Sequence, residues 1–134
     1  MNVKSFTIGE QSYNAQMASA VKQDELLGLL SAKIFLGFEV AHRKGETLGE
    51  KELMVMLMTL PAEQKAKVAS ILTEKVLLSG TQIAVSVKDF QGKMVQWNEL
   101  LSKLLIWNLA DFFDFTSAEV QNEEHQANQA VMTE

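Results

Sequence analysis

The chain contains one proline, Pro61, and seven glycines in 134 residues. Proline and glycine most often end helices and strands, so a chain with few of them favours long regular elements, above all helices. Apolar residues make up 47% of the sequence and charged residues 22%, a balance typical of globular proteins. A chain of this length has room for one core. The sequence therefore predicts a single, mainly α-helical domain.

The first residues alternate in the manner of a β-strand. Lys4, Phe6 and Ile8 lie at every second position and are separated by Val, Ser and Thr. Gly9 begins a dipeptide that fits a two-residue type II′ turn, because glycine supplies the positive φ that the first turn position needs. In this register Phe6 lies opposite Tyr13. The pattern predicts a short β-hairpin over about residues 3–15, which must lie on the helical body because an isolated hairpin is marginally stable.

The rest of the body has helical periodicity. Apolar residues recur at intervals of three and four over about residues 19–44, 47–59, 61–79 and 87–115. Gly37 interrupts the first of these segments, and a break there would make a fifth helix. We expect a compact bundle of about four to five helices with the hairpin at its N-terminal end.

Local signals indicate where these helices begin. Residues 47–50 fit a capping box, in which a Thr hydroxyl and a Glu carboxylate each accept a hydrogen bond from the other residue's backbone N–H. Pro61 suits the first position of a helix, where its missing N–H costs nothing. Residues 86–89 resemble a second capping box, with Asp in place of Glu. Residues 81–86 are consistent with either a short strand or an extended linker.

The acidic residues are unevenly spread along the chain. The net charge is −5, and residues 117–134 contain four glutamates without any lysine or arginine. We therefore expect a nearly neutral domain over residues 1–116, followed by an acidic, polar and mobile tail over residues 117–134. Such a body offers no basic surface for nucleic acid.

No segment has the length or composition of a membrane or export signal. The longest purely apolar run, from Leu53 to Met58, has six residues, whereas a membrane-spanning helix needs about 18. The first residues also lack the apolar centre of a signal peptide. We therefore expect a cytoplasmic protein with no membrane partner.

The residue types that carry chemistry are few. Without cysteine, disulfides, cysteine-ligated zinc, iron–sulfur clusters and thiol catalysis are excluded. Neither His42 nor His125 has a second ligand at metal-binding spacing. Asp111 and Asp114 lie three residues apart, so they suit either acid–base chemistry or the solvent-exposed edge of an amphipathic helix, which is the commoner arrangement. We expect no catalytic site, no cofactor and no metal.

Two apolar features remain as candidate partner-binding sites. The first is the short helix with Met54, Met56 and Met58, because methionine is flexible and Met-rich surfaces adapt to varied apolar partners. The alternative is a central helix that is buried on every side. The second is the last helix, which is apolar almost all round in its second half. Its candidate residues are Ile106, Trp107, Phe112 and Phe113. A partner would cover them, unless the domain buries them itself.

Two stretches of the chain resemble the tail assembly chaperones of long-tailed, siphovirus-type bacteriophages. Residues 5–15 and 18–27 resemble the start of these proteins. Residues 87–94, running into Leu100 and Leu101 and then residues 107–113, are similar to their end. Together these stretches cover about half of the chain, and neither is a catalytic signature.

The resemblance implies a mostly helical protein that binds the hydrophobic tape measure protein and keeps it soluble until the tail tube assembles. It also implies a location in the host cell cytoplasm, absence from the mature virion, and a longer frameshifted form that contacts the tail tube protein. Many copies along one tape measure protein would favour a homo-oligomer. The alternative is a structural subunit of a virion or of another helical assembly.

Overall fold

The structure is a computed structural model, and it describes residues 3–117. Most of these residues are helical, and a small antiparallel sheet forms at the N-terminal end, so the predicted fold class and hairpin are confirmed. The predicted tail lies outside the described residues from position 118 onward. In chain order the elements are β1 (Val3–Ile8), β2 (Gln11–Gln16), α1 (Ala20–Arg43), α2 (Glu50–Met58), α3 (Ala62–Thr73), β3 (Val76–Leu78), the 3-10 helix η1 (Val87–Phe90) and α4 (Met94–Asn108). Residues 110–117 are helical again after a break at Leu109.

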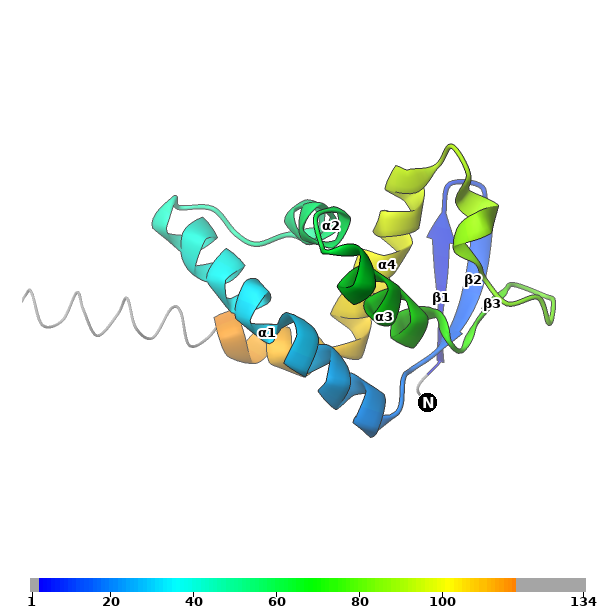
Figure 1. Cartoon of the computed structure of the whole chain (residues 1–134), viewed down its shortest axis with the longest axis horizontal. Helices are drawn as coiled ribbons and strands as arrows, with labels where there is room; N and C mark the ends of the chain where they lie inside the picture. The colour runs from blue at the N-terminus through cyan, green and yellow to red at the C-terminus, as the bar shows by residue number, and fades with distance from the viewer. Residues whose placement is uncertain (1–2, 118–134) are drawn as a thin grey trace, which may run out of the picture.

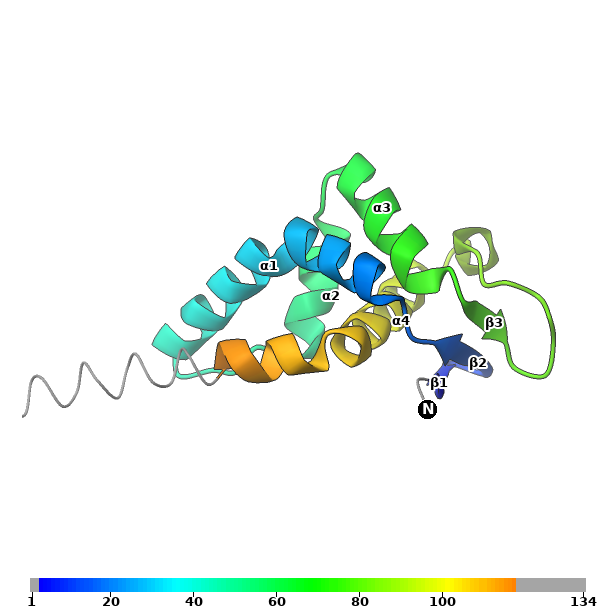
Figure 2. The same cartoon turned by 90° about the horizontal axis from the view of Figure 1, so that it is seen from below.

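The sheet lies at one end of the molecule, and α1 with residues 110–117 lies at the other (Figure 1). Helices α2, α3 and α4 occupy the space between them, as the second view also shows (Figure 2). Helix α4 forms the centre of the core, with Leu100, Leu101, Leu104 and Leu105 fully buried. Most of its apolar surface from Trp97 to Leu109 is therefore covered within the domain, although Ile106 and Trp107 are only half-buried. Met94 and Val95, at the start of the helix, are exposed.

The hairpin forms in the predicted register, with Phe6 opposite Tyr13 and Ile8 opposite Gln11. Gly9 has a φ of 60°, while no other type of residue in the described part of the chain has a positive φ, so the turn is type II′. One face of the sheet packs on the core. Phe6 meets Trp107 edge to face, with ring centroids 5.6 Å apart. Tyr13 stacks on Phe90 at 6.2 Å.

The other face of the sheet is polar. The Ser5 hydroxyl donates to Asn14 Oδ1 at 2.7 Å, and the Ser79 hydroxyl donates to the same oxygen at 3.1 Å. The hydroxyls of Thr7 and Ser12 lie 3.1 Å apart and share another hydrogen bond. The sheet therefore buries one side and exposes the other, as alternation in the sequence predicts.

The third strand corrects the predicted helix over residues 61–79. Helix α3 ends at Thr73, and Val76–Leu78 pairs antiparallel with β2. Residues 81–86 then turn back along β3, where the Leu78 N–H donates to the Ile83 carbonyl at 2.9 Å and the Val85 N–H donates to the Val76 carbonyl at 3.0 Å. Strand pairing with a distant segment outweighs the local helical period here.

Two helix starts also differ from prediction. Before α2, the Gly49 backbone N–H donates a hydrogen bond to Glu52 Oε2 at 2.9 Å. The capping interaction is therefore displaced by two residues from the predicted box over residues 47–50. Pro61 immediately precedes α3, which begins at Ala62, instead of occupying its first position.

Helix α1 passes through Gly37 without a break.

The predicted helix over residues 87–115 is divided into three parts. The capping box over residues 86–89 is confirmed, but it begins the short helix η1, and α4 starts only at Met94. The second break follows Asn108, whose backbone carbonyl accepts a hydrogen bond from Gln23 Nε2 at 3.2 Å. The Phe112 N–H, which would bond to that carbonyl in a continuous helix, donates instead to Asp111 Oδ1 at 2.8 Å.

The buried Asn108 side chain joins α4 to the segment that leads into α1. Its Oδ1 accepts from the Ala18 N–H at 2.8 Å, and its Nδ2 donates to the Leu104 carbonyl at 2.9 Å. Lys65 makes a similar junction among three helices, since its ammonium donates to the Leu57 carbonyl at 2.7 Å and to Asn98 Oδ1. Burial lowers the pKa of Lys65.

We expect Asn108→Ala to lower the free energy of unfolding by about 1–3 kcal/mol, because it leaves the Ala18 N–H without its acceptor. Urea unfolding followed by circular dichroism measures this. Ser5→Ala, which removes an exposed hydrogen bond to Asn14 Oδ1, is the control and should lose less stability than Asn108→Ala. Equal losses in the two variants would contradict this role for the acceptor.

Tyr13 is the only tyrosine in the chain, so its ionisation can be followed by absorbance near 295 nm. Burial raises its pKa, and the negative charge of Asp89 raises it further. The folded protein therefore holds this proton above pH 10, where the unfolded chain releases it. The contribution of Tyr13 to the free energy of unfolding is therefore fully present below pH 10, and it is lost as the pH rises through the pKa of the folded state. We expect Asp89→Asn to lower the Tyr13 pKa, whereas Asp114→Asn should leave it unchanged.

Candidate binding surface

A strongly apolar hollow on the described surface lies between α1 and residues 110–117. This hollow, the α1 groove, has a volume of about 650 Å³ and is lined by Ser31, Ala32, Phe35, Leu36, Glu39, Phe112, Phe115 and Thr116. Its largest exposed side chains come from opposite walls. Leu36 of α1 is 57% exposed and Phe115 is 59% exposed. Glu39 is the single charged residue in the lining, so the groove suits an apolar ligand.

The groove exists because the chain changes direction after α4. The break at Leu109 lets residues 110–117 run beside α1, where Phe113 lies against Phe38 with ring centroids 6.1 Å apart. Phe112 and Phe113 meet edge to face at 6.0 Å. The buried Thr116 hydroxyl donates to the Phe112 carbonyl at 3.1 Å. Phe113 thus holds this segment on α1 and leaves Phe115 open to solvent.

A second hollow, the α2 groove, lies between α1 and α2. It has a volume of about 330 Å³, and Val40, Leu48, Val55 and Met56 contribute apolar parts of its lining. Lys33, Lys44, Glu46 and Glu52 also line it, so its surroundings are more charged than those of the α1 groove. This hollow is smaller and less apolar, and it is the weaker candidate for an apolar partner.

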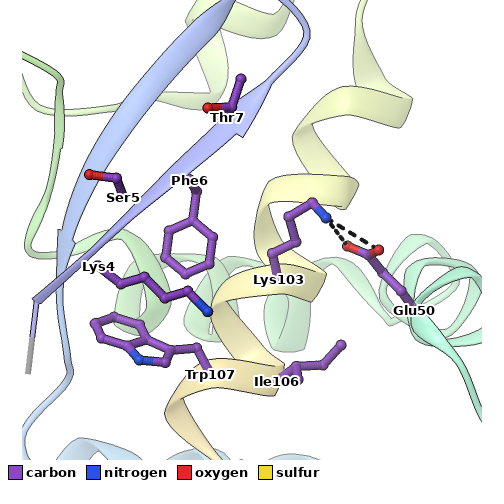
Figure 3. Close-up of a pocket in the computed structure, with 8 residues that line it drawn as sticks. All are labelled: Lys4, Ser5, Phe6, Thr7, Glu50, Lys103, Ile106 and Trp107. Carbon is purple, nitrogen blue, oxygen red and sulfur yellow. Dashed lines mark hydrogen bonds and ion pairs between the residues drawn. The ribbon is translucent and has the colours of Figure 1, made fainter.

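A third hollow, the β1 groove, lies between β1, α2 and α4 (Figure 3). Its volume is about 410 Å³, and Figure 3 shows Phe6, Ile106 and Trp107 along its apolar side. Lys4 lies over the Phe6 ring, 5.4 Å from the centroid. On the far side Lys103 pairs with Glu50 at 3.0 Å.

The structure distributes the predicted partner-binding residues over separate surfaces. Met56 lines the α2 groove. Met54 is half-buried and is not part of that lining, and Met58 is exposed. Ile106 and Trp107 line the β1 groove, whereas Phe112 lines the α1 groove and Phe113 packs on Phe38. Helix α2 buries only Leu53 and Leu57, so it is not enclosed on every side. The two predicted apolar features therefore do not form one site.

Sequence reasoning missed the wall of the α1 groove that α1 supplies. Phe35 and Leu36 lie on the side of this helix opposite the buried stripe of Leu26, Leu30 and Ile34, because each residue advances about 100° around the axis. Apolar residues on a face opposite the core-facing stripe are the signal that could have indicated an additional contact surface. Phe115 was visible only as one more apolar residue of the predicted last helix.

No group of three or more His, Cys, Asp and Glu side chains in residues 3–117 is placed to hold an ion. Asp111 and Asp114 are both exposed, and Asp111 accepts the hydrogen bond from the Phe112 N–H. Over the same residues, no helix combines the length and apolar character required to cross a bilayer.

Comparisons of the chain with protein-family models, with curated proteins and with solved structures find no match.

Proposed function

We propose that this protein is a tail assembly chaperone of long-tailed bacteriophages, and that it binds an apolar segment of the tape measure protein in the α1 groove. The observation that carries the proposal is the pair of exposed apolar walls, with Leu36 on one side and Phe115 on the other. The sequence resemblance over residues 5–15, 18–27, 87–94 and 107–113, with Leu100 and Leu101, supports the same function.

The shape and chemistry of the groove favour a helical ligand. An amphipathic helix binds by laying an apolar face into a hydrophobic groove, with contacts spaced three and four residues apart. Along α1, Ala32, Leu36 and the nearby Phe35 present apolar contacts at this spacing. Burying such side chains releases water and needs no charged partner, which suits reversible holding of an apolar chain.

The remaining parts of the proposal follow from the same role. The protein acts in the host cell cytoplasm, leaves before the virion is complete, and performs no catalysis. A longer frameshifted form would bring the tail tube protein to the same complex. A structural subunit of the virion is the second candidate, and immunoblotting of purified particles separates the two, since only a structural subunit stays in them.

The test is coexpression with the tape measure protein of the same phage. We expect the tape measure protein to remain in the soluble fraction and to copurify with this chain. Precipitation of the tape measure protein to the same extent with and without this chain would contradict the proposal.

A further inference from the structure

Strand β1 lies at the edge of the described sheet, away from the α1 groove. In the sheet order β1-β2-β3, residues 83–85 cover the outer edge of β3. No described residue pairs with the outer edge of β1. In Figure 2, β1 lies at the border of the molecule, with β2 and β3 on one side of it only.

The backbone groups at this edge can be assigned from the other strands. Ser12 and Gln16 of β2 direct their backbone groups toward β3, since the Ser12 carbonyl accepts from Ser79 and the Gln16 N–H donates to Lys75. Alternate residues of β2 therefore bond to β1, and these lie opposite Lys4, Phe6 and Ile8. The N–H and C=O groups of the residues between them point away from the sheet. Val3, Ser5 and Thr7 thus present three donors and three acceptors at the open edge.

We propose that β1 pairs antiparallel with β1 of a second copy of this chain, across a two-fold axis at Ser5. This pairing joins the two three-stranded sheets into one sheet of six strands. It also gives hydrogen-bond partners to the outward N–H and C=O groups of both copies. An exposed strand edge is a template for such pairing, and a two-fold axis uses the same surface on both chains.

The side chains of Lys4 and Phe6 select this register, and their reciprocal match suits a second copy of the same strand. Lys4 is the only charged residue of β1, and a register centred on Lys4 would place two ammonium groups opposite each other. A register centred on Ser5 places each Lys4 opposite Phe6 of the other chain, and Lys4 already lies over a Phe6 ring in its own chain. The register centred on Ser5 also pairs every residue from 3 to 7 with a β1 residue of the other copy. A register centred on Thr7 would leave residues 3 to 5 without such a partner.

The pairing also covers the apolar side of the β1 groove. Phe6 of each copy lies beside Ile106 and Trp107, and the second strand would cross the open mouth of this hollow. On the polar face, Ser5 would meet Ser5 and continue the row of hydroxyls formed with Asn14. Both faces of the joined sheet therefore keep the chemistry that each has in one copy.

Sedimentation equilibrium of the full chain, alone, tests the proposal. We expect a dimer, and we expect Ser5→Pro to weaken it about tenfold or more, because proline removes an outward N–H and obstructs the partner strand. Ser5→Ala loses only the hydroxyl and should dimerise like the parent chain. A monomeric parent chain, or a dimer that Ser5→Pro leaves unchanged, would overturn the proposal.

A cross-linking experiment tests the register and does not depend on Ser5→Pro being folded. The chain has no cysteine, so Ser5→Cys carries one thiol. A short bismaleimide should join two copies of this variant, because residue 5 lies on the proposed axis. Ser12→Cys, on β2, should stay uncoupled, because three strand spacings of about 4.8 Å separate the two β2 strands. Equal coupling of both variants, coupling of neither, or coupling of residue 5 only to a tape measure protein would contradict self-pairing through β1.

Discussion

Replacing Leu36 and Phe115 together by glutamine is expected to abolish the holding of the tape measure protein while leaving the domain folded. Both side chains are more than half exposed and belong to opposite walls of the α1 groove. Burying an apolar side chain of this size against a partner contributes about 1.5–3 kcal/mol. Loss of two such contacts corresponds to a reduction in affinity of about a hundredfold or more.

The glutamine substitutions are chosen to spare the fold. Glutamine keeps the net charge unchanged and has a helix propensity close to that of leucine. Surface substitutions of this kind change stability by about 0.5 kcal/mol. The coexpression assay should therefore report tape measure protein in the pellet, while circular dichroism of the purified double variant stays like that of the parent.

The matched control is the double variant Val21→Gln and Ile83→Gln. These side chains are 77% and 60% exposed and line none of the three grooves. They remove the same kind of exposed apolar surface at other places on the molecule. This control should hold the tape measure protein like the parent chain. Equal loss in both double variants would show that general surface hydrophobicity, and not the α1 groove, holds the partner.

Leu104→Ala should strongly destabilise the domain. Leu104 is fully buried at the centre of α4, where its removal leaves a cavity that the surrounding helices fill only partly. We expect the free energy of unfolding to fall by about 2–5 kcal/mol, measured by urea or thermal unfolding.

Leu36→Ala is the matched control for this deletion. It removes the same atoms from a side chain that is mainly in water, and alanine favours the helix, so the change in stability should be within about 0.5 kcal/mol. If the two leucine deletions changed the unfolding free energy equally, the assignment of α4 as the buried centre would be wrong.

The sequence predicted the elements whose signals are local. The hairpin follows from alternation and from the turn at Gly9, and both lie within residues 3–15. Helix α1 follows from apolar residues at intervals of three and four over residues 19–44. In the structure it begins after Ser19, whose hydroxyl accepts the Lys22 N–H at 3.3 Å. These features depend on neighbours in sequence, so a pattern in one sequence is enough to predict them.

The features that sequence reasoning missed depend on contacts between distant segments. Strand β3 has three residues, and it exists because Val76 and Leu78 pair with Ala15 and Tyr13. The α1 groove lies where the chain turns along α1 after helix α4 ends at Asn108. The carbonyl of Asn108 accepts a hydrogen bond from Gln23 Nε2 there. Neither contact leaves a periodic signal, which is why the last helix was predicted as one continuous element.

The most direct test of the central claim is site-specific photo-cross-linking in cells that express this chain with its tape measure protein. A photoreactive amino acid at position 36 should give a covalent adduct with the tape measure protein. The same amino acid at position 63, an exposed site on α3 outside the three grooves, should give none. Adducts of equal yield from both positions, or none from position 36 while the two proteins copurify, would contradict binding in the α1 groove.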